Sequence, residues 1–479
     1  MVSNTQYKLK KNLNSLDVFV VAFGAMIGWG WVVSSGQWIQ SGGVIGAVLG
    51  FALGGIMIFN IGLVYAELTT SLPQNCGVHT FSFMAFGPNV SFLCSWAMLL
   101  SYISVVCYEA CSFPIIVEYI FPGLKFGYLY SVGEFDIYLS WILISVLNSI
   151  IIIGLNILGV KFAAKLQSVL TAVIAFVGLA LVIASLCTGD MSNIKSQIFV
   201  GKNSVDFLKN IIQIAVITPF FFFGFDVIPQ AAEEINIPLK KIGRIMMLSI
   251  LMAFIFYSSI IFSVGYVMNP SDIASSINSS GLVSADAMVI AFKSEAMAKV
   301  LIFGGICGIL TSWNSFMIGG SRALYALSNA KIIPKCFSHL SSRFKTPVTA
   351  LLFLGLLSII SPFLGQGMLT WIMKAGNLGC CVAYLIVSIS FIKLRKKYPL
   401  INRPYKVRHV AFVGGMSMIL SAFMTGLYIV PSKSFSLNVY EWIIVGIWYA
   451  LGLVFYYYAR ISYKDSFANI QINDIICSG

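Results

Sequence analysis

Long apolar runs recur along the whole chain, and they constrain its fold more than any other feature of the sequence. A membrane-spanning helix needs about 20 predominantly apolar residues. Twelve runs meet this criterion: roughly 16–38, 42–68, 90–120, 137–157, 163–187, 208–230, 244–268, 297–327, 347–364, 368–392, 410–431 and 440–459. Only 10% of the 479 residues are charged, whereas soluble globular domains carry about 25%. We therefore expect an all-α integral membrane protein that forms one polytopic membrane domain over residues 1–479.

Lys and Arg residues gather in alternate connecting segments. If the N-terminus is cytoplasmic, 22 of the 30 fall in cytoplasmic segments, and an excess of basic residues marks the cytoplasmic loops of membrane proteins. Both termini are therefore expected in the cytoplasm, and the net charge of +13 requires no nucleic-acid partner. No small-residue cleavage site follows the basic start at Lys8, Lys10 and Lys11, so the first run is expected to be a retained helix. With the short tails, this favours a bacterial plasma membrane.

The first apolar run contains glycines where a continuous membrane helix would otherwise be expected. Gly24, Gly28, Gly30 and Gly36 all lie within "VAFGAMIGWGWVVSSGQW", residues 21–38. In lipid every backbone N–H and C=O group needs an internal partner, so an interrupted helix persists only where the freed groups face protein or an aqueous cavity. Glycine also lets a ligand approach the backbone, because it has no Cβ atom. The alternative interpretation is that these glycines only allow close helix packing.

A second interrupted run, "IAVITPFFFFGFDVIPQAAEE", covers residues 214–234. Pro219, Gly224 and Pro229 are predicted to break it. The first and sixth runs are equivalent positions in two five-span repeats of opposite topology, and two further spans follow. The three parts cover about 16–187, 208–392 and 410–459. Interrupted helices at matching positions of inverted repeats are typical of transporters with a site at the middle of the membrane. The two breaks are therefore predicted to line one substrate cavity.

Unwinding at "GAMIGWG" would free backbone groups of both polarities. The N–H groups of Trp29 and Gly30 would begin the following half-helix, and the carbonyl groups of Ala25 and Met26 would end the preceding one. The positive and negative ends of two helix dipoles would then face one pocket. This arrangement suits a zwitterion, with its carboxylate on the N–H groups and its ammonium group on the carbonyl oxygens.

Four segments resemble motifs of the amino-acid permeases in the amino acid, polyamine and organocation (APC) superfamily, in order and at the family's spacing. These segments are "FGAMIGWGWVVSSG", "YAELTTSLPQNCGVHTFSFMAFGP", "FFFFGFDVIPQAAEEINIPLKKI" and "GGSRALYALSNAKIIPKCF…KTPV". The resemblance extends over essentially the whole chain. It implies twelve helices, two inverted five-helix repeats (helices 1–5 and 6–10) with helices 1 and 6 unwound around the substrate, and two C-terminal helices.

Carried over by residue, the resemblance predicts substrate-binding positions in both breaks: Met26, Ile27, Gly28, Trp29 and Gly30 in the first, and Phe220, Phe222, Phe223 and Gly224 in the second. Part of the phenylalanine run is expected to pack in the core or against lipid, because consecutive residues point in several directions. Two residues depart from the family pattern. Trp29 stands where the family has a small residue, and Cys76 replaces a glycine.

Three ionisable residues lie inside apolar runs: Glu109 in the third, Asp226 after the break in the sixth, and Lys374 in the tenth. Such residues are costly in a membrane and are functional candidates by default. The resemblance places Glu109 and Lys374 near the substrate pocket, where they would pair with each other or contact opposite ends of a charged substrate. The alternatives are a buried interhelical hydrogen bond for Glu109 and an extension to the outer interface for Lys374.

The candidates for ion coupling are Thr311 and Ser312 in the eighth run, together with Asp226. Many relatives carry a lysine in helix five in place of a bound cation, and the matching position here is Ile174. The two hydroxyl groups could bind Na⁺, which prefers oxygen ligands, or could simply pack helices; H⁺ is the other candidate ion. The ten cysteines form no CxxC pair, so no metal site, disulfide framework or cofactor is expected.

These features predict a secondary active transporter that moves a small amino acid or a related amine across the bilayer by alternating access. An exchanger of such substrates is the alternative. A membrane sensor with this fold would be expected to carry a long tail or a soluble domain. A membrane enzyme would need a nucleophile and a base, or a metal cluster, facing one pocket. Glu109 and Lys374 are the only candidate pair for this in the sequence, and no enzymatic activity is expected. A channel would not require paired helix breaks.

Overall fold

The computed structural model describes residues 11–73, 77–132, 135–365, 367–431, 436–464 and 467. Lys8, Lys10 and Cys76, which the sequence analysis singled out, lie outside these ranges. Eleven described helices are long and apolar enough to cross a membrane. They are α1 (Ser15–Met26) continued by α2 (Gly30–Val33), α4 (Val44–Ser71), α6 (Pro88–Ile120), α7 (Leu139–Ile157), α8 (Val160–Thr188), α10 (Ser204–Phe221), α12 (Leu239–Val267), α15 (Glu295–Asn329), α17 (Gly367–Lys397), α18 (Val410–Ile429) and α19 (Val439–Tyr463). The expected polytopic helical fold is confirmed.

The ninth expected span is shorter than the others. Residues 347–364 form α16 (Val348–Ile360) and a single 3₁₀ segment, η4 (Ser361–Leu364). Together they make an apolar helix below the length of the other eleven. A polytopic helical fold is therefore established, whereas the twelfth crossing and the inverted repeats stay predictions.

The first helix breaks where its glycines predict. A capping box of Asn14 and Asp17 starts α1, which ends at Met26, and α2 begins only at Gly30. A second short segment, α3 (Ser35–Gly42), continues the run. Residues 27–29 therefore leave the helix inside the bundle.

The sixth helix breaks at one of the three residues expected to interrupt it. α10 ends at Phe221 and α11 (Val227–Gln230) follows, so that residues 222–226 connect them. Gly224 has φ +140°, a conformation that residues with a Cβ atom rarely adopt. The same expectation was wrong for Pro219 and Pro229. Pro219 lies inside α10, and Pro229 lies in α11, whose first turn tolerates a residue without an N–H group.

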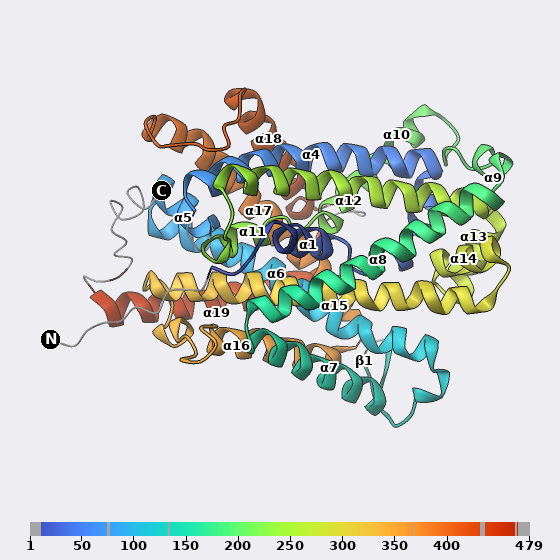
Figure 1. The fold of residues 1–479 in the computed structure, drawn as a ribbon, viewed down its shortest axis with the longest axis horizontal. Coiled ribbons are helices and arrows are strands. Elements are labelled where there is room, and N and C mark those ends of the chain that lie inside the picture. Colours follow the sequence, from blue (N-terminus) through green and yellow to red (C-terminus); the bar gives the residue numbers. More distant parts are fainter. Residues whose placement is uncertain are drawn as a thin grey trace.

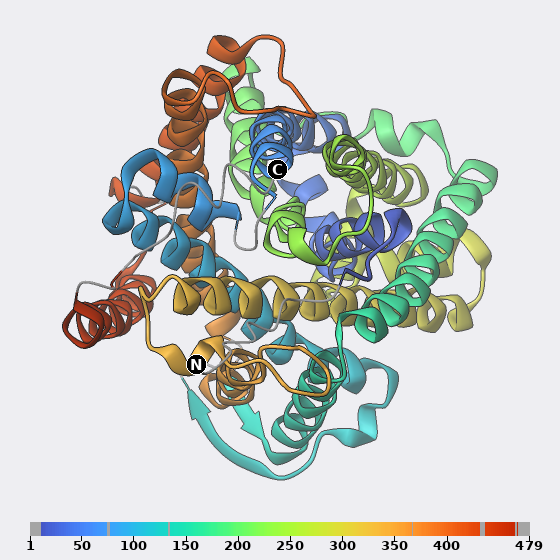
Figure 2. The same cartoon turned by 60° about the vertical axis from the view of Figure 1, so that its left-hand side comes forward.

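The broken helix α1 lies at the centre of the bundle, where it packs against α8, α11, α12 and α15 (Figures 1 and 2). The other central helix is α6, which packs against α15 and α17. It is the most enclosed of the eleven long helices. In its apolar 18-residue stretch 89% of the residues are buried, compared with 28% in the corresponding stretches of α10 and α19. Two central helices therefore flank the space where a buried site can form, and the peripheral helices present apolar side chains outward, as lipid contact requires.

Short elements connect the long helices. They are η1 (Pro122–Leu124), η2 (Ala232–Glu234), η3 (Lys335–Ser338), α5 (Gly77–Phe86), α9 (Met191–Lys195), α13 (Pro270–Ser279), α14 (Val283–Phe292) and an antiparallel hairpin of β1 (Tyr128–Val132) and β2 (Phe135–Tyr138). From the sequence these segments are expected to be plain connections. They are too short for the length criterion that identifies membrane helices.

Candidate functional site between the two broken helices

The two helix breaks face each other across a small buried cavity. Its lining comes from both breaks and from three further helices: Ala25, Met26, Gly28, Trp29, Gly30, Val105, Tyr108, Glu109, Phe220, Phe221, Phe223, Tyr257, Ser312 and Phe316. The cavity volume open to the centre of a water-sized sphere is about 30 Å³, which is room for a few water molecules, because each needs about 10–15 Å³ by this measure. A larger ligand therefore enters only when some of these side chains move.

The break in the first helix leaves backbone groups next to the cavity. The N–H groups of Gly28 and Trp29 donate to no acceptor in the described part of the chain. On the other side of the break, the carbonyl oxygen of Met26 accepts a 2.8 Å hydrogen bond from the hydroxyl group of Tyr257 on α12. Free donors thus remain at this break, whereas one of its acceptors is already used by the protein.

Glycine is required in both breaks because the two segments approach each other closely. A Cβ atom on Gly224 would lie 2.6 Å from the Cβ atom of Ala25 and 3.0 Å from the backbone nitrogen of Met26. A Cβ atom on Gly30 would lie 2.3 Å from the ring of Phe221. The two broken helices therefore contact each other directly.

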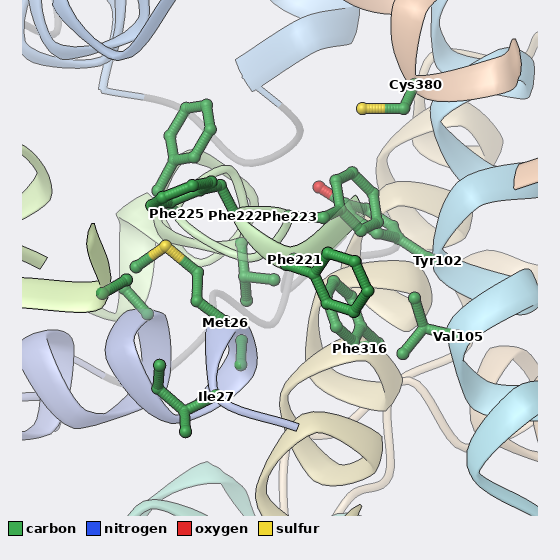
Figure 3. Packing of buried hydrophobic residues seen from close by; sticks show 14 of the residues in the cluster. Met26, Ile27, Tyr102, Val105, Phe221, Phe222, Phe223, Phe225, Phe316 and Cys380 are labelled. Carbon is green, nitrogen blue, oxygen red and sulfur yellow. The ribbon is translucent and has the colours of Figure 1, made fainter. Parts of the chain in front are cut away.

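Aromatic side chains form most of the apolar wall. The rings of Phe223 and Phe316 stack at a centroid distance of 5.0 Å, and Phe220 meets Tyr108 edge-on at 5.8 Å. Figure 3 shows Phe223 and Phe316 on the side of the break that carries Val105, whereas Phe222 lies on the other side, near Met26. The phenylalanine run thus divides between the cavity and the surrounding core.

Glu109 on α6 is the acidic residue of the lining. Its side chain is 3% exposed, and its Oε1 atom accepts a hydrogen bond from the hydroxyl group of Ser312 on α15. Its Oε2 atom is buried without a partner among the described residues. No Lys, Arg or His side chain is part of the lining. The site therefore offers a buried carboxylate oxygen that a ligand could contact.

Several predicted substrate-binding residues line the cavity: Met26, Gly28, Trp29, Gly30, Glu109, Phe220 and Phe223. Three other predicted residues from the breaks do not. Ile27 is fully buried in the core, and Phe222 packs against Phe51 and Tyr257. Gly224 contacts the first break through its backbone, so its place in the site is structural.

Lys374 lies elsewhere. Its Nζ atom is 3.4 Å from Oε1 of Glu441, which completes the capping box of Asn438 in the first turn of α19, and the Lys374 side chain is 29% exposed. It is not among the residues that line the cavity. The structure thus contains a Lys374–Glu441 pair and not the Glu109–Lys374 pair considered from the sequence. Glu441 lies in the first turn of the last helix, and nothing in the sequence links this position to the tenth run.

The candidate coupling residues have different partners. Thr311 donates its hydroxyl hydrogen to the carbonyl oxygen of Gly308 at 2.8 Å, whereas Ser312 donates to Glu109. Asp226 accepts a 2.9 Å hydrogen bond from the N–H group of Gly224. Of these three residues, Ser312 lines the cavity. The coupling roles stay predictions.

Buried amides that the sequence analysis did not select lie beside α1. Nε2 of Gln167 on α8 donates to the carbonyl oxygen of Thr311 at 3.0 Å and to the hydroxyl oxygen of Ser315 at 2.9 Å. Ser315 in turn donates to the carbonyl oxygen of Val21 at 3.0 Å. Asn314 donates to Oε1 of Gln167 at 2.9 Å. An uncharged amide inside a polar stretch of an apolar run gives little sequence signal.

One end of the broken helices is closed by the N-terminal segment. The N–H group of Asn12 donates to the carbonyl oxygen of Glu234 at 2.9 Å, and the N–H group of Asn236 donates to the carbonyl oxygen of Leu13 at 2.8 Å. The Glu234 carboxylate also lies 2.7 Å from Nε of Arg322 on α15, and both side chains are buried. This end therefore has to separate before the cavity can open toward it.

The chain was compared with known proteins. The family model described as amino acid permease matches residues 13–459. The chain is 24% identical to a branched-chain amino acid permease and 24% identical to a methylthioribose transporter, both of Bacillus subtilis strain 168, over 94% of each chain. It is 26% identical to an aspartate-proton symporter of the same organism, over 88% of this chain and 79% of the relative. The resemblance seen in the four motifs is confirmed.

Proposed function

Because the chain belongs to the amino acid permease family, we propose that it is a secondary active transporter that moves a small amino acid or a related amine by alternating access. The observation that carries this proposal is the small cavity between two broken helices, beside which lie the Glu109 carboxylate and the N–H groups of Gly28 and Trp29, which are free among the described residues. Transporters hold their substrates at such paired interruptions near the middle of the membrane. The named relatives are permeases or transporters.

The proposed architecture has twelve membrane crossings, two inverted five-helix repeats and both termini in the cytoplasm of a plasma membrane. The eleven long helices and the shorter α16 with η4 support the number of crossings. The positions of the breaks in α1 and α10 support the repeats, because they interrupt the first and sixth expected spans. In this scheme, access alternates as the N-terminal closure at Leu13 and Glu234 forms and separates.

Uptake into proteoliposomes tests this function. The purified protein should accumulate a labelled amino acid or amine against its gradient, and Gly30→Val should abolish uptake, because a side chain there collides with Phe221. Gly426→Val is the matched control, since a Cβ atom on Gly426 in α18 meets nothing within 4 Å.

Loss of uptake in both glycine variants would show only general damage, so the variants are compared after their melting temperatures are shown to match that of the wild type. Normal uptake by a folded Gly30→Val variant would place the substrate site elsewhere. Uptake that requires a substrate on the opposite side would favour the exchanger.

A further inference from the structure

The carboxylate of Glu109 lies directly against the broken segment of the first helix. A Cβ atom on Gly28 would be only 2.9 Å from Oε1 of Glu109 and 3.3 Å from the hydroxyl oxygen of Ser312. Gly28, whose N–H group is free among the described residues, therefore lies beside the Glu109 carboxylate. A carboxylate of the protein occupies the neighbourhood in which an amino acid would place its own carboxylate.

The charges of the lining do not favour a second anion. Glu109 is the residue of the described lining that is ionised as a free side chain at neutral pH, and the remaining members are apolar, hydroxylic or phenolic. A ligand carboxylate would bring two like charges together in a low-dielectric space, where their repulsion is much stronger than in water. A protonated amine would instead neutralise Glu109.

The remaining oxygen of Glu109 needs a hydrogen-bond donor. Its Oε2 atom is buried and has no partner among the residues the structure describes, whereas buried polar groups in proteins are rarely left without one. An ammonium group has three N–H donors and no acceptor. The rings of Tyr108 and Phe220 lie beside this carboxylate in the same lining, and aromatic faces attract cations.

We propose, on the basis of the proposed transport function, that the transported substrate is a primary amine without a carboxylate group. Its ammonium group binds Glu109, and its apolar part lies among the aromatic side chains of the cavity. Glu109 supplies the negative charge that the carboxylate of an amino acid would otherwise bring. Ser312 holds the carboxylate in place by donating to its other oxygen.

Matched ligand sets test this proposal on the full-length protein in detergent. Each set shares one apolar group: leucine, 3-methylbutylamine and 4-methylpentanoate form one, and phenylalanine, 2-phenylethylamine and 3-phenylpropanoate form another. We expect an amine to raise the melting temperature at a concentration at least tenfold lower than its amino acid requires. The carboxylic acids should have no effect. A ligand that binds only the folded state raises its apparent stability.

Variants separate charge recognition from folding. Glu109→Gln should weaken amine binding at least tenfold, and Glu109→Asp should retain part of it. Glu118→Gln is the matched control on the same helix, because Glu118 pairs with Lys125 outside the cavity, and its amine affinity should stay within twofold of the wild type. Each variant must first show a cooperative melting transition.

The outcomes distinguish this inference from the function on which it rests. Tighter binding of the amino acids than of their amines, or unchanged amine binding in Glu109→Gln, would overturn the amine assignment. If the protein gives one of these results and still accumulates amino acids in proteoliposomes, the proposed transport function stands although the amine assignment fails. A folded wild type that neither binds nor transports any member of either set would count against both proposals.

Discussion

Gln167 is a fully buried amide on α8 that holds two other helices through its side chain. It donates to the carbonyl oxygen of Thr311 and, at 3.4 Å, to that of Val20 on α1. A sodium ion bound between these helices would need the same oxygen atoms as ligands. In this conformation an amide donor satisfies them without an ion.

We therefore expect uptake to be independent of sodium. Initial rates in proteoliposomes should agree within experimental error when sodium is replaced by choline at fixed pH, because Nε2 of Gln167 already donates to the carbonyl oxygens of Thr311 and Val20. Dissipating the proton gradient with a protonophore in parallel shows whether the assay detects coupling. A rate several-fold higher in sodium would instead support the Thr311–Ser312 ion site.

His79 on α5 lies outside the eleven long helices and is 3% exposed. Burial lowers the pKa of His79 from its ordinary value of 6.5 to about 4. The neutral ring hydrogen-bonds to the hydroxyl group of Ser91 at 2.6 Å. The unfolded chain therefore binds a proton at a higher pH than the folded protein does.

This difference predicts a loss of stability in acid. The contribution of neutral His79 to the free energy of unfolding is complete above pH 6.5 and is lost as the pH falls from 6.5 toward 4. The loss reaches up to about 3 kcal/mol, because each pKa unit corresponds to about 1.4 kcal/mol. Melting temperatures between pH 7 and 5 should fall less in His79→Gln than in the wild type. His409→Gln, which changes an exposed histidine, should follow the wild type. Equal slopes in all three proteins would contradict the assignment.

The site residues that the sequence predicts are those with an unusual chemical identity for a membrane helix. Gly28 and Gly30 stand out because they lie close together in a run that is matched by a second interrupted run, and Glu109 stands out because a carboxylate is costly in a membrane. Phe221 and Tyr257, by contrast, are common in apolar helices, and their orientation toward the cavity depends on how α10 and α12 pack. Orientation of this kind has no signal in a single sequence.

At the scale of the elements, helix length and glycine predict more than proline does. The long runs were located to within several residues, since each had to contain enough apolar residues to cross the bilayer. The breaks lie at Gly30 and Gly224, each of which approaches the other broken helix too closely for a Cβ atom. Pro219 and Pro229 were misleading, because a proline at the end or the first turn of a helix does not have to interrupt it.

The closure between the N-terminal segment and η2 depends on one buried ion pair. Arg322→Met leaves Glu234 as an uncompensated buried charge, which costs roughly 3–5 kcal/mol. The double variant Arg322→Met/Glu234→Leu should be more stable than Arg322→Met alone, because it removes both charges. Chemical unfolding of the two variants and the wild type measures this difference.

The partly exposed ion pair of Lys125 and Glu118 is the control for this comparison of variants. Its Lys125→Met variant should lose no more than about 1 kcal/mol, as is usual for surface ion pairs. A double variant at Arg322 and Glu234 that is less stable than Arg322→Met would show that the carboxylate has another partner in the closed end.

At the scale of the whole molecule, the distribution of basic residues predicts the orientation in the membrane. Two cysteines report on it, because Cys187 near the end of α8 and Cys336 in η3 are exposed, whereas the other cysteines of the described ranges are buried. With both termini in the cytoplasm, Cys187 falls on the outer side and Cys336 on the inner side.

A membrane-impermeant maleimide applied to intact cells should therefore label the wild type at Cys187 and not at Cys336. The Cys187→Ser variant should lose this labelling, and Cys336→Ser should keep it. After the cells are permeabilised, Cys336 should become reactive. Labelling of Cys336 in intact cells would reverse the predicted topology.

The space between the two broken helices leaves little room for water in the conformation described here. Ions cross a membrane protein along continuous files of water, and the cavity between the broken helices, with a volume of about 30 Å³, has room for only a few water molecules. Aromatic rings fill the rest of that level, and the Arg322–Glu234 pair seals the end beside the N-terminal segment. We therefore expect liposomes that contain the protein without any substrate to retain an ion gradient as long as protein-free liposomes do.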